Sequence, residues 1–190
     1  NIPTLIRYIR QTVLNAGMRG ILTQNWRVGK NMSDKWTTSS LGEITTLITS
    51  GSRGWAKYYS ESGSTFVRAQ NISKDVLDLT DAAYVKLPNS VEGIRTLIKK
   101  NDLLVTITGA NVTKTAHVDI DIKDAYVSQH VGLVRFKNAI NSKFIYLFLI
   151  SESYGRKQLL DSAYGQGKPQ LNLDNIKEVK IDVPSNDEQD

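Results

Sequence analysis

The chain has 190 residues, 40% of them hydrophobic, which is enough for one domain with a real core. It contains no cysteine, so disulfides, thiolate metal sites and thiol nucleophiles are excluded, and a cytoplasmic location is expected. No apolar run approaches the roughly 18 residues of a membrane span, and no signal peptide is visible at the N-terminus. Because the first residue is Asn, we expect a processed chain or a fragment of a longer one.

The net charge of +5 arises in the first 36 residues, where six basic groups accompany one acid, and the remainder is neutral. Overall charge therefore does not by itself indicate a nucleic-acid partner. Local asymmetry remains, because 53–74 holds four basic residues and one acid, and 156–168 holds three and one. Acids gather at 75–81 and 119–124. A domain without net charge can still present one positive face if its basic and acidic residues lie in separate zones.

Residues 3–18 have the spacing of an amphipathic helix. Pro3 suits a first turn, and glycines follow at positions 17 and 20. One helix cannot bury its own apolar stripe, so the stripe packs either on its own domain or on a partner helix. The stripe includes Leu5, Ile6, Ile9 and Val13.

After this helix the pattern changes. The polar stretch 24–40 predicts a linker, and the domain body is expected to start near Trp36. Strands dominate the middle of the chain and helices its ends, which predicts an α+β fold with a curved mixed β-sheet and flanking helices. The expected strands are 41–48, 66–69, 83–87, 102–108 (buried on both faces), 127, 131–136 and 179–183; the expected helices are 142–160 and 173–177, the latter capped by Asn172 or Asp174.

The segment 51–59 combines glycines, cations and aromatic residues. Arginine can form a bidentate contact with guanine, lysine can neutralise phosphate, and aromatic rings can stack on or wedge between bases. The alternative is a hairpin loop whose Trp55 and Tyr58 fold back over the core. The candidate contact residues are Arg53, Trp55, Lys57, Tyr58 and Tyr59.

A second candidate segment, 66–72, alternates like a strand and then ends in amides. The alternation places Arg68 and Gln70 opposite Val67. Glutamine and asparagine are the side chains that pair with adenine in a bidentate manner, so Arg68, Gln70 and Asn71 are candidate base contacts. The alternative is a strand end with ordinary turn residues.

Two further loops carry polar and basic residues. In 102–116 a buried strand leads into a Gly turn, whose amides can hold an anion, but the pattern lacks the second Gly and Lys-Ser/Thr pair of a P-loop. In 164–170 a flexible basic loop precedes a capped helix, without the strand–helix context of a dinucleotide fingerprint. The candidates from these loops are Asn111, Thr113, Lys114, Tyr164, Gln166 and Lys168.

No catalytic or metal centre is indicated. His117 and His130 are the only histidines and stand in different segments, where structural roles are expected. No carboxylate cluster has the metal spacing of a nuclease, and no methyltransferase motif is visible.

The ordered set of segments resembles one target recognition domain of a type I restriction–modification DNA specificity subunit. Residues 13–23 look like the end of a conserved spacer helix, and Leu41-Gly42-Glu43-Ile44 looks like the opening of the domain. In 66–72, Asn71 stands in place of the usual acid. Asn101, directly before 102–116, and Thr113, within it, stand where glycines are frequent in the family. The segments 128–131 and 164–189 complete the set.

From this resemblance we expect residues 1–25 to be part of a spacer helix and 26–35 to be a linker. Residues 36–184 would form the recognition domain, and 185–190 would start the next spacer region. The resemblance implies a chain without catalytic activity that reads one half of a split double-stranded DNA target. Its partners would be methyltransferase subunits and, through them, restriction subunits, or a second copy of the half subunit. S-adenosylmethionine, ATP and Mg²⁺ would be bound by partner subunits, and Leu5, Ile6, Ile9 and Val13 would face a subunit interface.

Two other classes of function remain open. The chain can be a protein-interaction scaffold whose own DNA affinity is negligible. An enzyme such as a nuclease is the third reading, and magnesium-dependent cleavage by the purified chain would support it.

Overall fold

The computed structural model describes residues 2–32, 36–88, 93–165 and 167–190. A four-stranded antiparallel sheet of order β2-β11-β8-β9 forms its centre, with β2 (Thr45–Ser50), β11 (Val131–Phe136), β8 (Leu103–Thr106) and β9 (Thr115–His117). Successive side chains of a strand point to opposite faces. Accordingly Leu103 and Val105 enter one core cluster while Leu104 enters another, which confirms that this strand is buried on both faces.

One face of the central sheet is covered by helices. These are α4 (Ser142–Ile150), α5 (Gly155–Ser162) and α6 (Leu173–Glu178), whose apolar side chains share the first core cluster. Asn141 caps α4 and Asn172 caps α6, each through its side-chain oxygen. The expected single helix at 142–160 is interrupted, because Ser151 adopts an extended conformation.

The other face packs against a mixed sheet of order β10-β4-β7-β3, through side chains of β10 and β4. It contains β10 (Ala125–Val127), β4 (Ser64–Val67), β7 (Ala83–Val85) and β3 (Tyr59–Ser60), with β10 and β4 parallel and the other pairs antiparallel. Smaller elements complete this half: the pair β5 (Ile72–Ser73) and β6 (Val76–Leu77), and the 3₁₀ turns η1 (Trp55–Tyr58), η2 (Ala69–Asn71) and η3 (Ile94–Thr96).

The start of the domain differs from the expected elements in two places. The polar stretch 24–40, expected as a linker before a body that starts near Trp36, contains α2 (Gln24–Gly29) and then β1 (Thr37–Ser40), which pairs antiparallel with β12 (Lys180–Val183). Instead of a strand from residue 41, the chain forms the short helix α3 (Leu41–Ile44). The physical reason is a capping box, in which Ser40 and Glu43 satisfy each other's backbone N–H groups.

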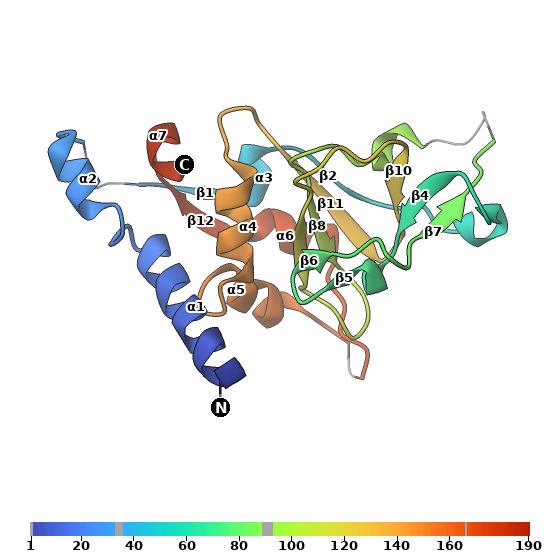
Figure 1. Cartoon of the computed structure of the whole chain (residues 1–190), viewed down its shortest axis with the longest axis horizontal. Coiled ribbons are helices and arrows are strands. Elements are labelled where there is room, and N and C mark those ends of the chain that lie inside the picture. The colour runs from blue at the N-terminus through green and yellow to red at the C-terminus, as the bar shows by residue number, and fades with distance from the viewer. Residues whose placement is uncertain (1, 33–35, 89–92, 166) are drawn as a thin grey trace.

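Helix α1 (Ile2–Met18) forms as predicted and lies with α2 toward one end of the long axis, with the β10-β4-β7-β3 sheet toward the other (Figure 1). The last element, α7 (Asn186–Gln189), returns to α2. There the buried carboxylate of Glu188 accepts hydrogen bonds from Arg27, Thr23 (2.6 Å) and the Trp36 indole (3.1 Å). Among the described residues no helix has the length and apolarity needed to cross a membrane.

Candidate nucleic-acid interface

The strand pairing collects the candidate loops at one end of the central sheet. The C-terminal end of β2 lies opposite the start of β11, since Ser50 pairs with Gly132. The C-terminal end of β8 lies there too, since Thr106 pairs with Val131. We call this region the loop end and define it as 51–59, 68–71, 107–114, 128–130 and the described part of 164–170.

Backbone hydrogen bonds lock these loops together. The Gly51 N–H donates to the Ser128 carbonyl at 3.2 Å, and the Ile107 N–H donates to the His130 carbonyl at 2.9 Å. The Gly109 N–H donates to the Pro169 carbonyl at 3.3 Å. A Cβ at position 51 would lie 2.1 Å from the Val127 carbonyl oxygen, so only glycine permits this approach. Segments distant in sequence therefore form one continuous surface.

The first candidate segment divides into exposed cations and a buried ring. Arg53 and Lys57 are exposed, and the Lys57 ammonium lies 5.0 Å from the ring centre of the half-buried Tyr58. Tyr59 is 47% exposed. Trp55 is only 5% exposed and stacks on Phe66 at 5.6 Å between ring centres. Trp55 is therefore not an exposed contact: as in the alternative of a loop that folds back, its ring lies in the core beneath the loop.

The residues of the second segment also differ in exposure. Gln70 is exposed, and the half-buried Arg68 donates from Nη2 to the Asp81 carbonyl at 3.1 Å. Asn71 is 2% exposed; its Oδ1 accepts from the Arg68 N–H at 3.0 Å and its Nδ2 donates to the carbonyls of Asp78 and Asp81. All its hydrogen-bonding groups serve the turn, so the prediction that Asn71 meets a base is corrected.

The third segment lies beside the second, because the Asn111 Nδ2 is 3.4 Å from the Ala69 carbonyl. Lys114 is half-exposed and its ammonium lies 3.7 Å from Asp75. Thr113 is 1% exposed and has a positive φ of 70°, a conformation that favours glycine. Thr113 is therefore a buried turn residue, and its prediction as a contact is corrected.

The fourth segment is the most open. Tyr164 is 51% exposed and pairs through its backbone with Gln170, at 3.0 and 2.8 Å. Lys168 is exposed. Gln166 lies outside the described residues. This segment thus supplies one cation and one aromatic ring to the loop end.

Three residues in or beside the loop end were missed as candidates: Arg95, which contacts the first loop from outside it, and Gln129 and His130. Arg95 donates to Ser52 at 3.2 Å and also binds Thr49 and the Ser50 carbonyl, which fixes the start of the first loop. Gln129 and His130 immediately precede β11, and their Nε2 atoms are 3.0 Å apart. Their position directly before the predicted strand 131–136 was the available signal. Burial, and secondarily the positive charge of Lys168, lowers the pKa of His130 below its usual 6.5.

A cavity of about 260 Å³ opens into the loop end. We call it the aromatic pocket. Its apolar wall contains Trp55, Phe66 and Tyr59, and its polar rim contains Arg68, Gln129 and His130. The Arg68 Nε is buried and has no hydrogen-bond partner among the described residues.

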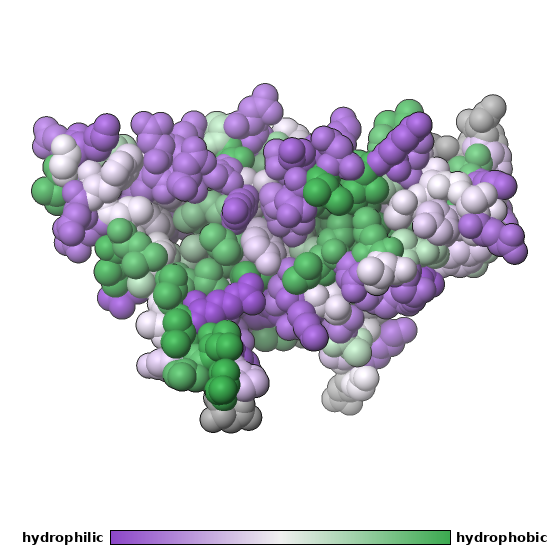
Figure 2. Space-filling model, in the orientation of Figure 1, coloured by the Kyte–Doolittle hydropathy of each residue, from purple (hydrophilic) through white to green (hydrophobic). Residues whose placement is uncertain are grey.

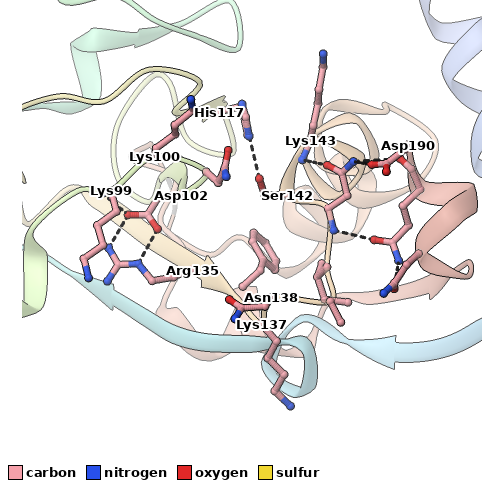
Figure 3. A pocket seen from close by; sticks show the side chains of 17 residues that line it. Lys99, Lys100, Asp102, His117, Arg135, Lys137, Asn138, Ser142, Lys143 and Asp190 are labelled. Atoms are coloured by element: carbon pink, nitrogen blue, oxygen red, sulfur yellow. Dashed lines mark hydrogen bonds and ion pairs between the residues drawn. The ribbon is translucent and has the colours of Figure 1, made fainter.

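A larger polar cavity, of about 710 Å³, lies at the opposite end of β8 and β11 (Figure 3). Its main ion pair joins Arg135 to the buried Asp102 at 2.7 Å, and Asp102 also accepts from the Lys99 N–H. His117 lies in the same cavity and shares a 2.9 Å hydrogen bond with Ser142. Burial is the main cause that lowers the pKa of His117; Asp119 opposes this effect and Lys143 adds to it. The contacts indicate a structural role for both histidine and ion pair. No group of potential metal ligands was found in the described part of the chain.

Helix α1 turns its polar side, not its apolar stripe, toward the domain. Its polar side contacts the domain: Arg7 pairs with Glu152 at 2.7 Å, Gln11 accepts from the Glu152 N–H at 2.9 Å, and Asn15 bonds Ser151 and Ser153. The apolar stripe faces away and appears as the green surface over α1 in Figure 2. Its predicted interface residues are 52–61% exposed: Leu5, Ile6, Ile9 and Val13.

Comparison with known proteins agrees with this arrangement. The family model described as "Type I restriction modification DNA specificity domain" matches residues 33–190, and the chain therefore belongs to this family. The fold and the family both confirm the α+β recognition domain expected from the sequence. Comparison with curated proteins gave no match.

Solved structures share the fold. The S subunit of a type I restriction–modification system from M. genitalium is 18% identical with a TM-score of 0.64, and the HsdS subunit from Thermoanaerobacter tengcongensis is 17% identical with 0.61. A chain from a study of complex assembly and conformational transition of the type I R-M system is 16% identical with 0.63. In each case 98% of this chain is covered, but only 44–45% of the other. The chain thus spans less than half the length of these structures.

Proposed function

We propose that this DNA specificity domain reads one half of a split double-stranded target through the loop end. The observation that supports the proposal is the convergence of five loops on one end of the central sheet, where Arg53, Lys57 and Lys168 are exposed. None of these three cations has an ion pair within the described residues. Unpaired exposed cations beside aromatic and amide groups suit a surface that meets both phosphates and base edges.

The residues of the loop end have different roles in this proposal. Lys57 and Lys168 would neutralise phosphates, which contributes affinity but no sequence information. Arg53 and Gln70 would reach base edges, since both side chains are exposed and have the geometry for bidentate contacts. Buried Asn71 and Thr113 would hold the loops in shape.

The partners belong to the proposal as well. The exposed stripe of α1 would pack against a methyltransferase subunit, a spacer helix or a second copy of the domain, because the polar contacts to Glu152 leave this stripe without a cover. The chain itself would carry out no reaction, and would act in the cytoplasm. S-adenosylmethionine, ATP and Mg²⁺ would be bound by the methyltransferase and restriction subunits.

The experiment is methylome sequencing of a host that expresses this chain, within its specificity subunit, together with the methyltransferase. The recognised motif gives a cognate duplex for binding measurements. Arg53→Ala or Gln70→Ala should then relax the motif at one position, with a loss of about 1–3 kcal/mol on the cognate duplex. Lys57→Ala should weaken all duplexes alike and reduce the salt dependence by about one charge. If all three variants bound like the parent, the loop-end assignment would be wrong.

A scaffold without DNA affinity of its own is the second candidate, favoured by the exposed stripe of α1. Gel-shift measurements on the isolated chain and on its complex with the methyltransferase distinguish the two. DNA binding that requires the methyltransferase and is unaffected by Arg53→Ala and Gln70→Ala supports the scaffold.

A further inference from the structure

The aromatic pocket has a shape that ordinary groove reading does not use. Duplex DNA presents its base edges inside a groove, which admits protruding helices, strands and side chains. A hollow in the reading surface can be filled only by something that protrudes from the DNA. A base rotated out of the stack is such a group, and proteins hold it by stacking and by hydrogen bonds to its pairing edge.

The lining of the pocket fits a nucleobase better than a phosphate. Trp55, Phe66 and Tyr59 form an aromatic wall, with Trp55 stacked on Phe66 and Tyr59 edge-on to Phe66 at 5.7 Å. Such rings favour a flat aromatic group. Only Tyr59 among these three is substantially exposed, at 47%, so it can close on a ring that enters.

The rim offers hydrogen-bonding groups of both kinds. The Arg68 Nε is a buried donor without a partner in the described residues, although buried polar atoms are normally satisfied. His130, whose pKa is lowered by burial, stays neutral near pH 7 and so has one donor and one acceptor nitrogen. Gln129 is exposed beside it and carries an amide. These groups match the mixed donors and acceptors of a base edge.

We propose that the aromatic pocket binds one base of the target, extruded from the duplex, and thereby contributes to sequence specificity. This inference rests on the proposed function, because it assumes that the loop end faces DNA. It assigns Tyr59 to stacking and His130 with Gln129 to recognition of the base edge.

The test is opposite-base scanning of the cognate duplex with the chain in its complete complex. At each position one base is kept and only its pairing partner is changed to a mismatch. A mismatch at a groove-read position should lower affinity about 10- to 100-fold. At the extruded position it should raise affinity about tenfold, because the pair no longer has to be broken. 2-Aminopurine at that position should gain fluorescence on binding.

Three variants locate the effect. Tyr59→Ala and His130→Ala should remove the mismatch gain and the fluorescence rise. Tyr84→Ala is the matched control, because Tyr84 is 40% exposed in β7 and does not line the pocket. A gain that persists in Tyr59→Ala belongs to another subunit and overturns the inference. So does a Tyr59→Ala variant that loses only methyltransferase binding, since a protein side chain would then occupy the pocket.

The outcomes separate the two proposals. Sequence-specific binding without a mismatch gain at any position overturns base extrusion and leaves DNA reading by the loop end intact. Absence of specific duplex binding by the complete complex overturns both.

Discussion

At the scale of single residues, a side chain suited to bind DNA is often used inside the domain. Asn71, Trp55 and Thr113 all lie in loops that reach the interface, yet each is 5% exposed or less. Asn71 has donors and an acceptor for adenine, but three backbone groups of its own turn already occupy them. The residue type indicates which contacts are chemically possible, and the local fold determines which partner the side chain contacts.

Asn71→Ala tests this distinction. It removes buried hydrogen bonds and leaves the carbonyls of Asp78 and Asp81 with fewer partners, so the free energy of unfolding should fall by about 1–3 kcal/mol. The recognised motif should stay the same. Denaturant unfolding and methylome sequencing measure the two effects, with exposed Gln70→Ala as the opposite case. A changed motif with full stability would restore Asn71 as a base contact.

The histidines make stability depend on pH. Burial lowers the folded-state pKa of both His117 and His130 below 6.5, so the unfolded chain binds more protons in the window from 6.5 down to the folded values. Stability therefore rises with pH through this window and falls on acidification.

Thermal unfolding between pH 7.5 and 5 should show a decreasing melting temperature, and His117→Gln should reduce the decrease. A variant with an unchanged pH slope would mean that His117 does not contribute. His130→Gln provides the comparison from the loop end.

At the scale of elements, the pattern of apolar residues predicts which helix or strand forms better than it predicts where that element packs. The strand at 131–136 has the predicted bounds, because it is a short, largely apolar run. Helix α3 was missed because a four-residue helix is too short to show periodicity. The only sequence signal for it is the capping box of Ser40 and Glu43. The meeting of loops 51–59 and 128–130 depends on the register of β2 and β11, which no local pattern contains.

Helix α1 shows the same limit. Its amphipathic pattern predicted the helix, but the stripe faces away from the domain while Arg7, Gln11 and Asn15 contact it. Apolar surface left in water favours association, at about 25 cal/mol per Å² of area covered.

The double substitution Leu5→Ser with Ile9→Ser should therefore weaken association with the methyltransferase subunit at least tenfold. The free energy of unfolding of the isolated chain should change little, because both side chains are more than half exposed. Titration calorimetry and denaturant unfolding measure these quantities. Arg7→Ala serves as the control, since an exposed ion pair contributes about 1 kcal/mol at most. Equal association of the double variant and the parent would contradict an interface on this stripe.

At the scale of the whole molecule, Glu188 joins the first and last described segments. Its carboxylate lies between Arg27 of α2 and the Trp36 indole. The side chains of Arg27 and Glu188 are 7% exposed or less. Few local signals could predict this contact, because its partners are more than 150 residues apart in sequence.

Glu188→Ala should lower the free energy of unfolding by about 3–5 kcal/mol, since it removes the carboxylate from a buried guanidinium. The double variant Arg27→Leu with Glu188→Leu should recover part of the loss, because no charge then remains buried. Exposed Glu178→Ala is the control and should be close to neutral. A Glu188→Ala variant as stable as the parent would show that the ion pair does not hold the two segments together.

The antiparallel pair of β1 and β12 has a consequence for exchange of the domain between proteins. Thr37 and Val183 are partners in this ribbon, so the chain enters and leaves the body at neighbouring points. A domain whose chain enters and leaves at adjacent points can replace another domain at a single junction without distorting the rest of the protein. The loop end is carried by other strands, at the ends of β2, β8 and β11, so a new set of loops arrives with its own scaffold. The ribbon thus gives the domain the geometry of an interchangeable cassette.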